Sequence, residues 1–221
     1  MEEKLCWCGS QKPYSECHEM NDKKLSFLQK QGFEVPTREM IKTPEQIAGI
    51  REACKINTAI LDEVAKHIKA GMSTEEIDRI VYEFTIAHDA TPAPLGFCGF
   101  PKSVCTSIND QVCHGIPSKD DILRSGDIVN VDVSTIYKGY YADASRMFMI
   151  GKVTKPAADL VAIAKQCLVK AVEAAQPWAQ LGDIGAAVSQ LARKHGYSVV
   201  TEFGGHGVGV EFHEDPFVAH V

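Results

Sequence analysis

Two aspartates lie in the strongest strand pattern of the sequence, residues 127–149. Valines alternate with polar residues along the first arm, which holds Asp132. The second arm holds Asp143 and follows a predicted turn at Lys138-Gly139. This turn pairs residue 132 with residue 145, which makes the two aspartates diagonal neighbours with Cβ atoms about 7 Å apart or less. Because a buried carboxylate needs a counter-charge, the pair is suited to one divalent cation or two. The alternative is that both carboxylates face solvent.

Three histidines add imidazole donors to this pair. His114 precedes a Gly-Ile-Pro sequence, and His206 and His213 lie in and after the glycine-rich segment 204–209. That segment lacks the Lys-Ser/Thr pair of a phosphate loop and the third glycine of a dinucleotide fingerprint. Each histidine alone is as compatible with an ordinary surface or packed residue. Together with the aspartates, these donors suit Mn, Fe, Co or Zn and a hydrolytic reaction.

Helix and strand patterns surround these residues. Two helices are predicted first, each opened by a capping box. One starts at Thr43 and ends near Gly71, and the other runs from Ser73 through Phe84. The remaining elements are an extended stretch over 96–108, the hairpin, helices over about 157–175 and 183–195, and a strand over 198–201. Helix pairs that alternate with hairpins predict an α/β (α+β) fold with an antiparallel sheet rather than a doubly wound one.

The first forty-three residues differ from the rest of the 221-residue chain. Acidic and basic residues balance there, so the whole net charge of −6 lies in residues 44–221, the predicted main domain. Residues 1–20 hold three cysteines and are predicted to form a knuckle, followed by a polar linker over 21–43. The acidic balance argues against general nucleic-acid binding. The sequence has no run of 18 apolar residues and no apolar leader, which predicts a soluble cytoplasmic protein with cysteines that are free or bind metal.

From about residue 40 to the end, the sequence resembles the type I methionine aminopeptidases. The resemblance rests on the motifs Cys-His-Gly-Ile-Pro (113–117), Gly-Asp-Ile-Val-Asn-Val-Asp-Val (126–133), Tyr-Ala-Asp-Ala-Ser (141–145), Gly-His-Gly-Val-Gly (205–209) and Phe-His-Glu-Asp-Pro (212–216), which occur in the family's order. It implies a pita-bread fold and a metal-dependent hydrolase that removes the initiator methionine from nascent polypeptides with a small second residue. It also implies a monomeric cytoplasmic enzyme with two divalent ions (Co, Mn, Fe or Zn).

The resemblance assigns a role to each candidate residue. Asp132 corresponds to the bidentate ligand of one ion, Asp143 to the carboxylate that bridges both, and His206 to a ligand of the other. His114 corresponds to the histidine near the scissile amide nitrogen, and His213 to the one that polarises the carbonyl oxygen. The methionine side-chain pocket corresponds to Pro94, Phe97, Phe100, Cys105 and Phe212. Pro94 replaces a cysteine that is frequent in the family, and the next two replace tyrosines; for these two phenylalanines, ordinary core packing is the alternative.

Two glutamate ligands of the family have no counterpart before Val221. The sequence therefore predicts that the C-terminal part of the catalytic domain is missing, that the 221-residue chain is nearly inactive, and that C-terminal extension restores methionine removal. The alternative function is a peptide-binding or ribosome-docking module of the same fold without a working centre. A proline-specific peptidase of this fold is disfavoured by the Cys-His-Gly-Ile-Pro motif and the methionine pocket.

The N-terminal cysteines resemble the short zinc motif at the C-terminus of SecA and on some bacterial methionine aminopeptidases. Cys6, Cys8, Cys17 and His18 supply the three thiolates and one imidazole of a closed tetrahedral structural zinc site. In this family setting, the motif implies docking to the ribosome or to another partner.

Overall fold

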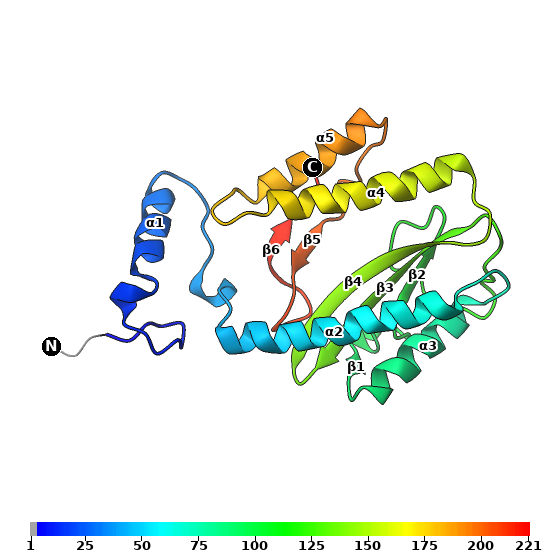
Figure 1. Ribbon diagram of the computed structural model, residues 1–221, viewed down its shortest axis with the longest axis horizontal. Helices are drawn as coiled ribbons and strands as arrows, with labels where there is room; N and C mark the ends of the chain where they lie inside the picture. Colours follow the sequence, from blue (N-terminus) through cyan, green and yellow to red (C-terminus); the bar gives the residue numbers. More distant parts are fainter. Residues whose placement is uncertain (1–3) are drawn as a thin grey trace. The chain divides into compact units, whose positions relative to one another are not determined.

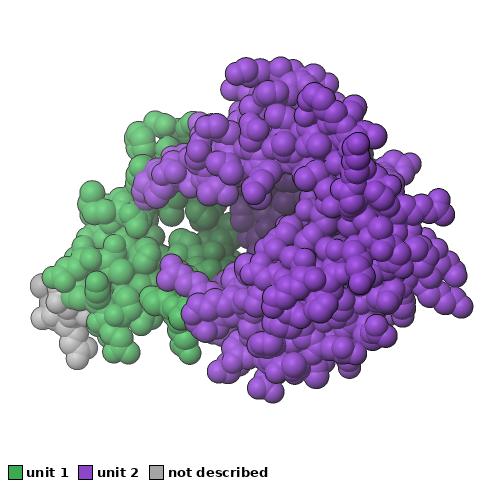
Figure 2. Space-filling view, turned by 45° about the vertical axis from the view of Figure 1, so that its right-hand side comes forward, with its two compact units in different colours: residues 1–49 green, residues 50–221 purple. Residues whose placement is uncertain are grey.

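The computed structural model describes residues 4–221. The chain divides into two compact units, Met1–Gly49 and Ile50–Val221, which Figure 2 colours separately. The division lies six residues beyond the boundary predicted at residues 43 and 44, because the first turns of helix α2 (Pro44–His67) belong to the N-terminal unit.

The N-terminal unit is built around a small knuckle. A bridge between Leu5 and Pro13 folds the chain back on itself, and the turn η1 (Tyr14–Glu16) follows. The stretch predicted as a linker contains most of helix α1 (Glu19–Lys30) and the turn η2 (Arg38–Met40). Acidic residues in the first turn of α1 and Lys30 in its last turn complement the helix dipole. The prediction of a polar linker did not take these helix signals into account.

Both predicted capping boxes open helices of the structure. At the start of α2, the Thr43 hydroxyl accepts a bond from Gln46 N–H at 3.2 Å, and the Gln46 side chain accepts one from Thr43 N–H at 2.8 Å. Helix α3 (Thr74–Ala87) begins with the same reciprocal bonds between Ser73 and Glu76. Helix α2 ends at His67, one turn before Gly71.

A four-stranded antiparallel sheet lies at the centre of the larger unit (Figure 1). Its long hairpin is formed by β3 (Ile128–Tyr137) and β4 (Tyr140–Met149), and the predicted pairing of residues 132 and 145 is confirmed. Lys138 and Gly139 both have positive φ, 51° and 82°, as the predicted tight turn requires. The other edge of β3 pairs with β1 (Thr91–Pro92) and β2 (Cys105–Ile108).

The core lies between this sheet and helices α2 and α3, which cover one face of it in Figure 1. Valines of β3 at alternate positions are fully buried there, together with Ile60 and Val64 of α2 and Ile77 and Val81 of α3. The buried face of β3 therefore fixes which of its residues remain available on the opposite face, among them Asp132.

The remaining elements follow the hairpin. Helices α4 (Lys155–Ala174) and α5 (Gly182–Lys194) pack against each other, and a small antiparallel pair, β5 (Gly205–Gly207) and β6 (Glu214–Val218), comes last. Two predictions were wrong. Residues 198–201 form no strand, and the stretch 96–108 is extended only over β2, because Gly96 and Gly99 at positive φ bend the chain into the turn η3 (Phe97–Gly99). Within residues 4–221, no helix has the length and apolar character needed to cross a bilayer.

Candidate metal centre and substrate pocket

Asp132 and Asp143 face each other across the β3–β4 hairpin. Asp143 pairs with Ser134, two residues from Asp132, so the two carboxylates are diagonal neighbours on one face. Burial, then the charge and hydrogen bonding of Asp143, raise the pKa of Asp132 to about 7 despite the opposing effect of His206. Two partly buried carboxylates in contact repel each other when both are ionised, so this place favours a bound cation.

Two neighbours hold Asp143 in place. The Ser134 hydroxyl donates to Asp143 Oδ1 at 3.1 Å, and His206 Nε2 lies 3.6 Å from Asp143 Oδ2. His206 Nδ1 lies 2.8 Å from the carbonyl oxygen of Gly207, which can only accept, so Nδ1 carries the hydrogen. In the neutral imidazole this leaves Nε2, which is directed at the carboxylates, available as a metal ligand.

The glycines around His206 are dictated by backbone packing. A Cβ atom at Gly207 would lie 2.4 Å from the Asp215 carbonyl oxygen of the neighbouring chain segment. The Gly209 carbonyl accepts a bond from Tyr141 N–H at 2.7 Å, which joins this segment to β4 close to Asp143. The glycine-rich segment thus brings His206 to the hairpin rather than forming a phosphate loop.

His213 lies in a cluster of rings beside His206. The two imidazole rings are 4.4 Å apart, and His213 also contacts Phe212 at 4.3 Å and Phe97 at 5.3 Å. Phe97 meets Phe212 edge-on at 4.9 Å and is 45% exposed, so it is not part of the buried core. Loss of hydration, then the charge of His206, lower the pKa of His213, which is therefore neutral at pH 7.

His114 is held at the end of a loop by the glycine that follows it. A Cβ atom at Gly115 would lie 2.0 Å from the Thr106 carbonyl oxygen, and Gly115 N–H donates to the Ser107 hydroxyl at 3.1 Å. Both partners belong to β2, which pairs with β3 beside Asp132. The His114 ring itself meets the edge of Phe203 at 6.3 Å.

The other predicted pocket residues lie on the same side of the sheet or on the loop before β2. Cys105 pairs directly with Asp132, and burial followed by the charges of the two aspartates raises its pKa to about 12, so it stays a thiol. Pro94 is buried, and Phe100 is half-buried at the end of η3. A thiol and aromatic rings form surroundings that suit a thioether side chain.

The donor set suits divalent metal. Two carboxylates and one imidazole with a free Nε2 are ligands for Mn, Fe, Co or Zn. Among residues 4–221, one set of three or more Cys, His, Asp or Glu side chains has its donor atoms within 4.8 Å of one another, and it is the N-terminal set Cys6, Cys8, Cys17 and His18. The donor atoms of the two aspartates and His206 are spread more widely.

The N-terminal set has the dimensions of a single tetrahedral site. His18 Nδ1 lies 3.2 Å from the sulfurs of Cys6 and Cys17, and the sulfurs of Cys8 and Cys17 are 3.7 Å apart. Zinc–sulfur bonds of about 2.3 Å at tetrahedral angles place two sulfurs about 3.8 Å apart. Hydrogen bonds from Ser10 lower the pKa of Cys8 to about 6. Ser10 also lowers the pKa of Cys17, but burial and the neighbouring Cys6 and Cys8 raise it, so the thiols share their protons unevenly in favour of a thiolate at Cys8.

Asp22 connects this set to the rest of the N-terminal unit. One of its oxygens accepts bonds from Tyr14 Oη at 2.7 Å, Trp7 Nε1 at 3.1 Å and Arg38 Nη2 at 3.2 Å. The Trp7 ring in turn lies 4.6 Å from the His18 ring. Burial acts to raise the pKa of Asp22, but the bonds from Tyr14, Trp7 and Arg38 outweigh it and lower the value.

Comparison with known proteins places both parts of the chain. The profile of metallopeptidase family M24 matches residues 48–220, and that of the SEC-C motif matches residues 4–19. The methionine aminopeptidase of Chlamydia trachomatis is 44% identical over 222 residues, covering 97% of this chain and 75% of the relative. The chain belongs to the methionine aminopeptidases. It is a member of the metal-dependent aminopeptidases of family M24 and has their pita-bread fold.

Solved structures agree with this family membership. The methionine aminopeptidase of Rickettsia prowazekii superimposes with a TM-score of 0.80 at 42% identity, covering 81% of this chain and 72% of that one. The prolidase of Pyrococcus furiosus gives a TM-score of 0.69 at 24% identity, covering 82% of this chain and 52% of that one, and shows a shared fold alone.

Sequence reasoning missed three residues that the structure places beside the two candidate sites. Ser134 follows from the hairpin register, because it is the residue opposite Asp143. Tyr141, whose ring is stacked on Phe212 at 5.9 Å, carries no such signal because its partner lies far away in the sequence. Asp22 carries none because it lies in the stretch read as a linker.

Proposed function

We propose that this protein hydrolyses the peptide bond after an N-terminal methionine, using two divalent ions held by Asp132, Asp143 and His206. The observation that carries the proposal is the pair of facing carboxylates with His206 Nε2 directed at Asp143, next to a pocket of aromatic rings and a thiol. Bound divalent ions would supply a water of lowered pKa and a Lewis acid for the scissile carbonyl.

The residues around the carboxylates divide the remaining tasks. Phe97, Phe212 and Cys105 surround the methionine thioether, with Pro94 and Phe100 completing the pocket. His213, neutral at pH 7, donates an N–H to the carbonyl oxygen as negative charge develops there, and His114 lies near the amide nitrogen. The substrate is a nascent polypeptide with a small second residue, as the resemblance to the methionine aminopeptidases implies.

The N-terminal residues Cys6, Cys8, Cys17 and His18 bind one structural zinc ion. The sulfur and nitrogen spacing and the thiolate at Cys8 support this assignment. The resulting knuckle serves as a docking element, for which the ribosome is the proposed partner. Residues 44–221 form the catalytic domain, and the protein acts as a cytoplasmic monomer.

Release of methionine from Met-Ala-Ser in the presence of Mn²⁺ or Co²⁺ tests this proposal. The assay compares the 221-residue chain with a chain extended at its C-terminus by the remaining residues of the Chlamydia trachomatis relative, and includes an X-Pro dipeptide as a control. Methionine release by the extended chain, abolished by Asp143→Asn, is the expected result. No release by either chain, or a preference for the X-Pro dipeptide, would refute the proposal.

A further inference from the structure

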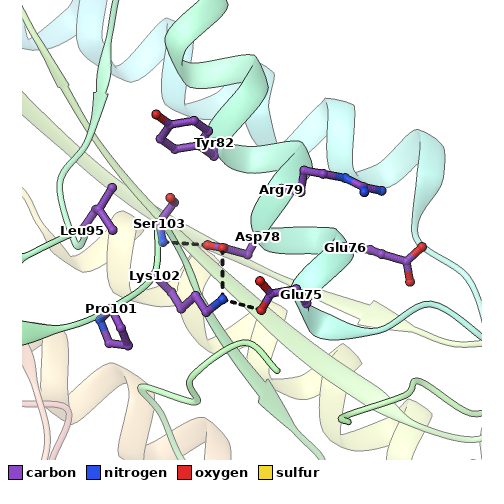
Figure 3. A pocket seen from close by; sticks show the side chains of 9 residues that line it. All are labelled: Glu75, Glu76, Asp78, Arg79, Tyr82, Leu95, Pro101, Lys102 and Ser103. Carbon is purple, nitrogen blue, oxygen red and sulfur yellow. Dashed lines mark hydrogen bonds and ion pairs between the residues drawn. The ribbon is translucent and has the colours of Figure 1, made fainter. Parts of the chain in front are cut away.

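A cavity of about 440 Å³ lies beside the first turns of helix α3. Neither Asp132 nor Asp143 lines it. One wall is α3, and the other is the segment 95–103, which also carries Phe97 and Phe100 (Figure 3). The contacts across this cavity therefore bear on the position of the proposed methionine pocket.

Asp78 of α3 holds the end of this segment. Its Oδ1 accepts a bond from Ser103 N–H at 2.6 Å, and Lys102 Nζ lies 3.9 Å from its Oδ2 (Figure 3). The Lys102 ammonium also bonds to the Glu75 carboxylate. The Asp78 side chain is only 14% exposed and Ser103 only 2%, so Asp78 shields this backbone N–H from bulk solvent as well as accepting its bond.

The segment is fixed at both ends. At its start, Ala93 N–H donates to the Ser134 carbonyl of β3 at 2.9 Å, and at its end Ser103 is bonded to Asp78. Between these points, the chain turns at Gly96 and Gly99, both at a φ of 83°. Backbone bonds within the turn, such as the one from Gly96 N–H to the Phe100 carbonyl at 2.8 Å, fix its shape, and the anchors at its two ends determine where it lies.

The same end of α3 holds the loop that follows His114. The Thr74 hydroxyl accepts a bond from Ser118 N–H at 2.8 Å, and the Ser118 carbonyl accepts one from Glu75 N–H at 3.2 Å. Thr74 N–H donates to the Asp121 carbonyl at 2.9 Å. The first two turns of α3 are therefore a common support for two loops that carry proposed substrate residues.

We propose that Asp78 is a positioning residue for substrate selection: by holding Ser103 and Lys102 it fixes the segment 95–103 against α3 and keeps Phe97 and Phe100 in place around the methionine side chain. The inference rests on the proposed function for the identity of the pocket. The bond to Ser103 itself is independent of that function.

Hydrogen exchange of the full chain tests the bond without any need for activity. Asp78→Ala should raise the exchange rate of the amides in 97–104 at least about tenfold, because Ser103 N–H loses its acceptor. Asp78→Asn, whose amide oxygen can still accept, should stay closer to the unchanged protein. Glu83→Ala removes an exposed acidic residue from the same helix and should leave these amides as they were.

Steady-state kinetics test the effect on selection, in the chain that the Met-Ala-Ser assay finds active. Asp78→Ala should raise KM for Met-Ala-Ser about tenfold with kcat within about twofold, and lower the preference over norleucine-Ala-Ser. If Asp78→Ala does not fold, Asp78→Glu carries the test, because it keeps the charge but displaces Ser103. Unchanged exchange in 97–104 would overturn the inference. Faster exchange with unchanged KM and preference would overturn it as well, while continued methionine release would leave the proposed function standing. Faster exchange in a protein that releases no methionine in any form would instead refute the proposed function.

Discussion

At the residue scale, the chemistry depends on a few side chains whose orientation is fixed by neighbours. Asp143 is held by the Ser134 hydroxyl, and His206 is held in one tautomer by the Gly207 carbonyl. Partners of this kind orient metal ligands and raise their affinity for the ion, although they do not touch it. The roles of Ser134 and Gly207 in orienting Asp143 and His206 can therefore be tested as directly as the roles of the proposed ligands.

Ser134→Ala should weaken binding of divalent metal about tenfold or more, because Asp143 loses a hydrogen bond that fixes its carboxylate. Titration of the protein with Mn²⁺, followed by calorimetry, measures the change. Thr58→Ala is a control away from the hairpin, because the Thr58 hydroxyl is exposed on α2 and bonds to the Cys54 carbonyl instead. Equal affinities for all three proteins would contradict the role given to Ser134.

His213→Ala should lower turnover about a hundredfold or more while metal content stays the same, because a donor to the developing oxyanion is lost and no ligand is removed. The measurement is kcat for Met-Ala-Ser together with metal analysis of the same sample. Loss of metal with a normal rate per bound ion would show that His213 is a ligand instead.

At the element scale, local signals predicted what local chemistry determines. The capping boxes at Thr43 and Ser73, the turn at Lys138-Gly139 and the pairing of residues 132 and 145 were all readable, since each depends on neighbours along the chain or on one hairpin. The structure of the stretches 96–108 and 198–201, which the sequence predicted as extended, could not be read from local signals. A strand exists only where a second strand bonds to it, and residue types alone do not show that partner.

The ring cluster at His213 was out of reach for the same reason. Phe97, Tyr141 and Phe212 come from η3, β4 and the β5–β6 connection, so only the folded chain brings them together. The resemblance to a family indicated Phe97 and Phe212 as pocket residues, whereas composition and spacing offered ordinary core packing as an equal alternative for Phe97 and Phe100. The 45% exposure of Phe97 argues against core packing for that residue, and its place in a methionine pocket stays a prediction.

Glu76→Gln should destabilise the fold in a pH-dependent way. Bonds from the Ser73 backbone and hydroxyl lower the pKa of Glu76 below its usual value, so its carboxylate contributes stability above the unfolded-state pKa. That contribution is lost as the pH falls through the folded-state pKa. The melting temperature of the variant should therefore lie below that of the unchanged protein at pH 7, and the two should converge in acid. Glu83→Gln, an exposed change on the same helix, should show no such difference.

At the scale of the whole molecule, the two units are stabilised by different physical means. The larger unit has a core of buried aliphatic side chains from α2, α3 and the sheet. In the described part of the N-terminal unit, the buried hydrophobic residues are Cys6 and Cys8, and α1 buries none of its residues. A segment with so little apolar burial needs another source of stability, which small domains commonly find in a metal ion.

Cys8→Ser should therefore remove one bound zinc ion and the order of the N-terminal unit, yet leave the larger unit intact. Metal binding to such a site supplies folding free energy, so its loss should expose the amides of α1 and of the Asp22 contacts to exchange. The amides of β3 and β4, which belong to the aliphatic core, should keep their protection. Zinc analysis and hydrogen exchange of the full chain measure both effects, with Cys54→Ser, an exposed cysteine of α2, as the matched control. Retention of zinc and of α1 protection in Cys8→Ser would show that the unit is held together without this ligand. Loss of protection in β3 as well would show that the two units fold as one.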